Sequence, residues 1–329
     1  MKNLFFNLRF GEIFIQAIKL NWEAERSMGK AYSKYRLDVI PEWEESGNTD
    51  EMLTDQLLKL QSSKRSAGEK LINEAYGAFF ETTKPLSYHT FTVSRFPREV
   101  DLAKTIADFP DSQDQHSIGA CTAFSVAFAL EVDSRSKNKN PVWNLDPFFL
   151  YREMMVYAGD GKTIEDLGGT IRQALETANR VGVASRHIFE PIGESKWNHE
   201  PTPADRKTAL LHRNFSFSAI RQSTNQIRAA ILSGHAVIFS FAISREINAW
   251  MKDPVVQNPT YILPTPWGAR DLKRVIGAHA VLITGYNDSN ELFTIQNSWG
   301  PLWGVNGRFF MTYNHVFLPF WSRDFYVVL

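Results

Sequence analysis

Cysteine is nearly absent from this chain, since Cys121 is the only one among 329 residues. A single cysteine excludes a disulfide framework within the chain, and that absence favours a reducing compartment, either the cytoplasm or a cell into which the protein is delivered. An excess of one charge is absent too, because 36 basic residues balance 36 acidic ones. The balance gives no electrostatic reason to expect a nucleic-acid partner or an anionic membrane.

Long apolar runs are also missing. No stretch approaches the roughly 18 apolar residues that identify a transmembrane helix. The first residues are basic and then apolar, but Arg9, Glu12 and Gln16 interrupt the run, so we expect no Sec signal and no membrane span. Hydrophobic residues still make up 43% of the chain, which is enough for two domains or one large two-lobed domain.

The first 92 residues have a helical pattern. Asn48 and Glu51 form a capping-box sequence, and a shorter helix is expected from Trp22 to Tyr35. Apolar residues recur at helical spacing behind the capping box, at Leu53, Leu57, Leu60, Ala67, Leu71, Ala75 and Phe79. We therefore divide the chain into an N-terminal helical region, residues 1–92, and a second domain, residues 93–329.

The second domain has helix signals first and strand signals later. An apolar run over 118–133 predicts a buried helix that begins at Cys121. Asp146 with Pro147, Thr170 with Gln173, and Ser223 with Gln226 are typical helix starts. Gly182 and Gly234 are expected helix stops. The strand-like runs follow at 236–243, 280–286, 292–296, 308–313 and 325–329. This order predicts an α+β fold with one lobe of each kind.

The surroundings of Cys121 favour a reactive thiol, although a lone cysteine is more often buried and inert. Gly119 and Ala120 leave the approach to the sulfur uncrowded, and the expected helix follows at once. The positive end of a helix dipole stabilises a thiolate and lowers the pKa of the thiol.

An imidazole and an amide follow further along the chain. His279 lies in an apolar, strand-like run, where a histidine is ordinarily a core residue. Asn297, 18 residues later, would hydrogen-bond the ring and fix its tautomer, and Trp299 would shield that bond from water. A thiol, an imidazole and an amide together can carry out nucleophilic catalysis.

These motifs resemble those of papain-like cysteine peptidases. That family has a glutamine six positions before its nucleophile, as Gln115 is before Cys121. The residues that match around the nucleophile are Gly119, Ala123, Phe124 and Ser125. The family's Asn-Ser-Trp-Gly-x-x-Trp-Gly-x-x-Gly run is present without gaps from Asn297 to Gly307, and His279 fits its His-Ala-Val element.

The resemblance implies a two-lobed fold, with the cysteine on a helical lobe and the histidine and asparagine on a β-barrel-like lobe. It implies that Cys121 is the nucleophile, His279 the general acid and base, Asn297 the orienting residue and Gln115 an oxyanion donor. Gly168, Gly169, Ala278 and Trp299 would contact a peptide or protein substrate. No cofactor is implied.

Three positions depart from the family pattern. Thr122 replaces an aromatic residue, Ile118 replaces a disulfide-forming cysteine, and His116 replaces a glycine. None of these changes removes a reacting group, and together they indicate a bacterial, disulfide-free branch.

A metal site is not expected. The remaining histidines are scattered and lack the paired spacing of metal ligands; they are His89, His116, His187, His199, His212, His235 and His315.

The role of residues 1–92 stays open between three alternatives. An inhibitory propeptide would be cleaved between Phe80 and Arg98, whereas an accessory domain or a partner-binding module would not. The family's usual propeptide signature is missing. Two functional alternatives also remain: a catalytically silent binding protein with its cleft blocked by the N-terminal helices, and an acyl-transfer enzyme acting on other amide bonds. Substrate preference is not readable, beyond Ser240 and Ala278 as candidates for part of the pocket.

Overall fold

The computed structural model describes most of the chain after residue 76. The described residues are 77–81, 84–139, 141–158, 164–186, 197–252, 261–266, 275–318 and 321–329. The helices expected at 22–35 and from residue 48 to 75 lie outside these ranges. Phe79, which the apolar spacing assigned to the second helix, lies in an extended segment. Its N–H donates to the carbonyl of Gly169, so this group bonds to a distant loop and not to the preceding turn of a helix.

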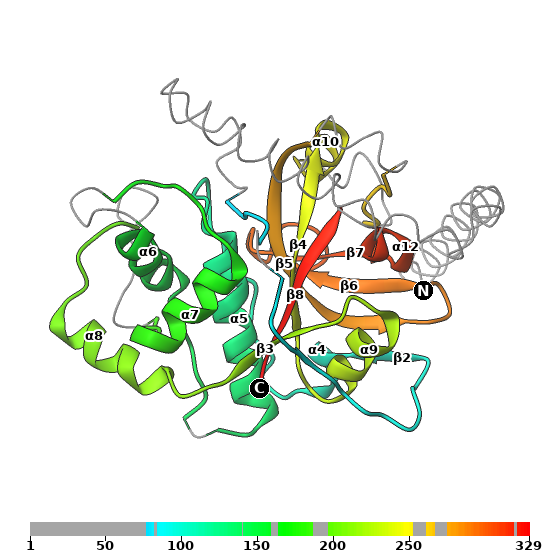
Figure 1. Ribbon diagram of the computed structural model, residues 1–329, viewed down its shortest axis with the longest axis horizontal. Helices are drawn as coiled ribbons and strands as arrows, with labels where there is room; N and C mark the ends of the chain where they lie inside the picture. The colour runs from blue at the N-terminus through cyan, green and yellow to red at the C-terminus, as the bar shows by residue number, and fades with distance from the viewer. Residues whose placement is uncertain are drawn as a thin grey trace, which may run out of the picture.

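The helices between residues 121 and 212 occupy one side of the molecule (Figure 1). They are α5 (Cys121–Ser136), α6 (Pro147–Ala158), α7 (Ile171–Val181), α8 (Pro203–Ala209) and the 3-10 helix η3 (Leu210–His212). The first 14 residues of α5 are buried, because this helix packs against α6 and α7 on one side and the sheet on the other. No helix in the described ranges is long and apolar enough to cross a membrane.

The predicted helix boundaries on this side are confirmed. Asp146 accepts from the N–H of Phe148, and Thr170 accepts from the N–H of Gln173. These bonds satisfy donors that the first turn of a helix leaves unpaired. Gly182 ends α7 with φ of +82°, a conformation that a side chain would disfavour.

On the other side, the described residues form a sheet of eight strands. They are β1 (Tyr88–His89), β2 (Glu99–Asp101), β3 (Phe217–Ile220), β4 (Val237–Ser244), β5 (Val275–Asn287), β6 (Leu292–Gln296), β7 (Arg308–Thr312) and β8 (Ser322–Val328). The order is β1-β3-β8-β4-β5-β6-β7, with β2 also paired to β5. Among the strands that the structure describes, β1 and β3 pair in parallel and the other pairs are antiparallel. The short helices α4 (Leu102–Thr105), α9 (Thr224–Leu232), α10 (Arg245–Lys252) and α12 (Tyr313–Phe317) connect or cover these strands.

The α+β fold with two lobes is confirmed, but the barrel-like form of the second lobe is wrong. The sheet is open, with β1 at one end of the strand order and β7 at the other. Closure would require these end strands to exchange backbone hydrogen bonds. Among the described residues, the backbone of β7 bonds instead to the segment 261–263, through Phe310 to Tyr261 and Leu263 to Phe310.

The central strand β5 brings the two lobes together at the predicted site. β5 begins at Val275, earlier than expected, so His279 lies within its ladder, opposite Phe241 of β4. β6 ends at Gln296, one residue before Asn297. Because α5 packs on β5, its first residue, Cys121, lies at the same junction.

Candidate active site

Cys121 is the first residue of α5 and is completely buried. Its N–H has no acceptor within the helix, as is general for the first turn. Backbone N–H groups of Ala280, Gly77 and Thr122 face the sulfur and favour the thiolate. Burial outweighs them and raises the pKa of the Cys121 thiol to about 11. The helix dipole is expected to lower the pKa of the Cys121 thiol. In this form the net effect is the opposite, because the sulfur has no access to water.

His279 and Asn297 form the expected pair. The ring Nε2 of His279 and Oδ1 of Asn297 are 2.8 Å apart. Oδ1 also accepts from the N–H of Ser298 at 2.9 Å, so this atom is an acceptor and Nε2 carries the proton. The tautomer then leaves Nδ1 as the basic nitrogen. Burial lowers the pKa of His279 to about 4, with the bond to Asn297 acting in the opposite direction.

Aromatic rings cover the His279–Asn297 bond, as the sequence predicts for Trp299. The ring centroids of Trp299 and His279 are 5.3 Å apart, and Trp303 meets Trp299 edge-on at 5.2 Å. Asn297 is held from the other direction, because its N–H donates to Gly307 and its carbonyl accepts from Ser112. The backbone hydrogen bonds and the tryptophan rings together fix the position of the Asn297 side chain.

Gln115 lies beside residues 118–121, which lead into α5, and is buried. Its Nε2 donates to the carbonyl of Ile118 at 2.7 Å, and its Oε1 accepts from the hydroxyl of Ser298. The amide nitrogen carries two protons, of which Ile118 accepts one. These bonds fix the amide plane, so a donor is held beside the start of α5.

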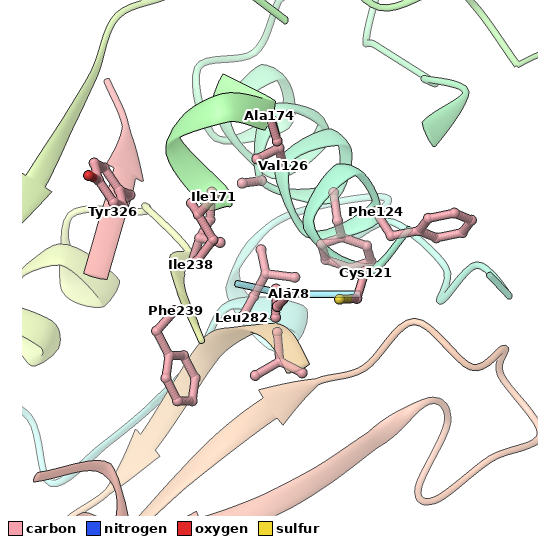
Figure 2. Close-up of a cluster of buried hydrophobic side chains, with 14 of the residues drawn as sticks. Ala78, Cys121, Phe124, Val126, Ile171, Ala174, Ile238, Phe239, Leu282 and Tyr326 are labelled. Carbon is pink, nitrogen blue, oxygen red and sulfur yellow. The ribbon is translucent and has the colours of Figure 1, made fainter. Parts of the chain in front are cut away.

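An extended stretch of this same chain, residues 77–81, lies against the predicted substrate-binding groups. We call it the cleft segment. The N–H of Gly169 donates to Gly77 at 2.8 Å, and the N–H of Phe79 donates to Gly169 at 2.9 Å. On the other wall, the N–H of Ala78 donates to the carbonyl of Ala278 at 3.3 Å. Figure 2 shows Ala78 beside the sulfur of Cys121.

The fit of the cleft segment depends on glycine. A side-chain carbon at Gly77 would lie 1.7 Å from the carbonyl oxygen of Gly119. A side-chain carbon at Gly168, where φ is +72°, would lie 2.2 Å from the carbonyl oxygen of Gly77. Two backbones can approach this closely only where neither carries a side chain.

The far end of the cleft segment is held by charged residues. The N–H of Glu81 donates to the carboxylate of Asp324 at 3.0 Å. The carboxylate of Glu81 accepts from the N–H of Arg172 at 3.0 Å, in the first turn of α7, where an anion is favoured. Phe80 is buried, with the Arg323 guanidinium above its ring.

The structure brings the predicted site residues together, and it adds a contact that the sequence did not predict, the cleft segment. Cys121, His279, Asn297, Gln115, Gly168, Gly169, Ala278 and Trp299 all gather at the junction of the lobes. Ser240, a guess for the pocket, is buried opposite Ala280 in the ladder. The signal that could have found the segment is the pair of small residues, Gly77 and Ala78, before two phenylalanines. Among the described residues, no group of three His, Cys, Asp or Glu side chains could hold a metal ion.

The fold and the thiol–imidazole–amide set define a cysteine hydrolase that acts on peptide bonds. The family model "Papain family cysteine protease" matches residues 96–317, more than half of the chain. The chain belongs to the papain family of cysteine proteases.

Individual proteins are similar over much of their length. An uncharacterized peptidase C1-like protein of Acanthamoeba polyphaga mimivirus is 27% identical over 226 residues, which cover 65% of this chain and 68% of the relative. The cysteine protease xylellain from Xylella fastidiosa has a TM-score of 0.66 at 22% identity, covering 79% of this chain and 97% of its own. Procathepsin B S9 from Trypanosoma congolense has a TM-score of 0.59 at 13% identity, covering 79% and 86%. At these identities the two structures support the fold alone.

Proposed function

We propose that this papain-family protease is a zymogen in the form described here, and that its cleft segment is the inhibitory element. One observation carries the proposal. The segment's backbone engages Gly169 and Ala278, the groups expected to hold an extended substrate. It also reaches Cys121, which is completely buried and whose sulfur faces the N–H of Gly77. A peptide substrate could not reach these groups until the segment leaves.

The protonation states support a latent form. Burial raises the pKa of Cys121 to about 11 and lowers that of His279 to about 4. Both groups are therefore neutral near pH 7, and the reactive thiolate–imidazolium pair is disfavoured. Departure of the cleft segment would return water to both groups and move each pKa toward its ordinary range.

In the open form, we assign the first chemical step to Cys121 and His279. The thiol gives its proton to Nδ1 of His279, and the sulfur forms a bond to the substrate carbonyl carbon. Negative charge develops on the carbonyl oxygen, for which the N–H of Cys121 and Nε2 of Gln115 are the donors. The imidazolium then protonates the leaving amine as the peptide C–N bond breaks.

The second step restores the enzyme. His279 takes a proton from water, whose oxygen attacks the acyl carbon. The thioester C–S bond breaks to release the acid product, and the imidazolium of His279 returns the proton to the sulfur. Asn297 keeps Nε2 protonated throughout, so that Nδ1 is the nitrogen that exchanges protons in both steps. Its neutral amide fixes the ring without adding a charge.

A permanently closed binding protein is the alternative, and it predicts no activity after the segment is displaced. The test uses the full chain. Phe79→Pro removes the N–H that donates to Gly169, whereas Phe79→Ala keeps this N–H and is the matched control. The measured quantity is the rate at which an epoxide-type cysteine-protease inhibitor labels Cys121.

We expect Phe79→Pro to be labelled roughly tenfold faster than Phe79→Ala, the ratio that corresponds to a bond worth about 1.4 kcal/mol. Cys121→Ala should not be labelled in either background. Equal rates for the two Phe79 variants would contradict inhibition by the segment. Labelling without hydrolysis of any peptide would favour the silent binding protein.

Exposure and backbone contacts support a processing site near the end of the N-terminal region, residues 1–92. Leu86 is fully exposed, whereas Tyr88 and His89 pair with β3 and Phe91 bonds to Gln226. We expect cleavage between Glu81 and Tyr88, which mass spectrometry of the activated protein would detect. The physiological compartment and a bacterial origin remain parts of this proposal, supported by the single cysteine and the disulfide-free motif.

A further inference from the structure

Two loops must be aligned for the proposed reaction. One is the nucleophile loop, residues 118–121, and the other is the glycine loop, residues 166–169, whose Gly169 is expected to hold the substrate backbone. The family's disulfide-forming cysteine is Ile118 here, so no covalent bond from that position holds the nucleophile loop.

A carboxylate connects these loops directly. Both oxygens of Asp166 accept from the N–H of Gly119, at 3.1 and 3.0 Å. A side-chain carbon at Gly119 would lie only 2.9 Å from Oδ1 of Asp166. The glycine two residues before the nucleophile is therefore needed for the close approach of this carboxylate.

A buried tyrosine completes the connection. The hydroxyl of Tyr151, from α6, donates to Asp166 and accepts from the N–H of Gly168 at 2.8 Å. The Tyr151 ring is fully buried and packs on Trp197, with centroids 5.1 Å apart. Burial and the neighbouring Asp166 raise the pKa of Tyr151 well above its ordinary value, so the hydroxyl keeps its proton and remains a donor.

We propose that Tyr151 and Asp166 are positioning residues that clamp the nucleophile loop to the glycine loop. The clamp runs from the N–H of Gly119 through Asp166 and Tyr151 to the N–H of Gly168. It sets the distance between the sulfur of Cys121 and the backbone that holds the substrate. This inference rests on the proposed roles of Cys121 and Gly169.

The test compares two labels on the full chain. Iodoacetamide needs only the thiol, whereas a peptidyl epoxide needs the thiol and the glycine loop in alignment. Both labels require the cleft segment to leave, so the ratio of their rates cancels that equilibrium. Tyr151→Phe removes only the hydroxyl, and Tyr157→Phe, an exposed residue on the same helix, is the matched control.

We expect Tyr151→Phe to lower the epoxide-to-iodoacetamide ratio roughly tenfold, because small misplacements cost large factors in rate. Asp166→Ala should lower it similarly, and the double variant should lower it no further, since the two residues act as one unit. A ratio equal to that of Tyr157→Phe, or effects that multiply in the double variant, would overturn the clamp.

A second measurement is independent of the proposed chemistry. Hydrogen exchange of the peptide that contains Gly119 should be faster in Tyr151→Phe than in the wild type, because a less firmly held Asp166 protects that N–H less. Unchanged exchange would overturn the clamp. If Cys121 is not the labelled residue in the wild type, the proposed function fails, and this exchange experiment still decides the clamp.

Discussion

The two halves of the site are held in different ways. On the sheet side, His279 lies within the ladder that β5 forms with β4, and its ring is covered by Trp299, which Trp303 backs edge-on. On the helix side, Cys121 stands where a loop becomes a helix, and hydrogen bonds from side chains hold that loop. The proposed base, His279, is thus held by strand pairing. The loop before the proposed nucleophile, Cys121, is held by side-chain hydrogen bonds.

This difference decides where the protein can be regulated. Moving His279 would require breaking several ladder bonds together, which is costly in a buried sheet. In the proposed zymogen, access to Cys121 would change when a five-residue segment leaves, at the cost of a few hydrogen bonds and one buried phenylalanine ring. We therefore expect the regulated motion to be that of the cleft segment, with the base already in place.

The largest expected effect comes from removing the support of the base. Asn297→Ala leaves the His279 ring without its acceptor and free to adopt the wrong tautomer. We expect kcat/KM for a peptide substrate of the activated protein to fall by about 100-fold or more. Cys121→Ala gives the background rate of the assay. Activity within twofold of the wild type would show that the ladder alone orients the ring.

A smaller effect should follow from removing the aromatic cover. Trp299→Ala exposes His279 to water while keeping the bond to Asn297. Because burial is the main cause of its low pKa, the pKa of His279 should rise from about 4 toward the ordinary value near 6.5. An NMR titration of the histidine ring would measure this rise. Trp197→Phe, far along the chain and packed on Tyr151, is a control that should leave the titration unchanged.

Much of this site could be predicted because its signals are local. Gln115 and Cys121 are six residues apart, and the run from Asn297 to Gly307 is continuous. Local patterns also found the starts of α6, α7 and α9, since a capping side chain acts within one turn.

The missed features depend on contacts between distant residues. Glu81 meets Asp324 across 243 positions, and Asp166 meets Gly119 across 47. No periodicity indicates such pairs, and an extended segment such as 77–81 obtains its conformation from its partners. The open sheet was missed for the same reason, because the edge of β7 is covered by residues 261–263, which precede it by almost fifty positions.

The smallest expected effect is on the pH dependence of stability. It compares the proposed catalytic residue, His279, with His315, a histidine of the core. Phe241 lies between His279 and His315, with ring centroids 6.0 and 6.2 Å away. His315 is fully buried, and burial lowers its pKa to about 3. The unfolded chain binds a proton there below about pH 6.5 and the folded chain does not, so the stability contributed by His315 is complete above pH 6.5 and is lost as the pH falls toward 3. The loss is about 1.4 kcal/mol for each pH unit.

Buried carboxyl groups act in the opposite direction, since burial raises the pKa of Asp146 and Asp324 to about 7. The net slope of the wild type is therefore not a measure of His315 alone. Urea unfolding of the wild type and His315→Leu between pH 7 and 5 isolates its part, because the carboxyl groups are common to both. We expect the stability of the wild type, minus that of the variant, to decrease as the pH falls from 7 to 5. Parallel curves would mean that His315 is protonated in the folded chain, and that burial beside Phe241 does not keep a ring neutral.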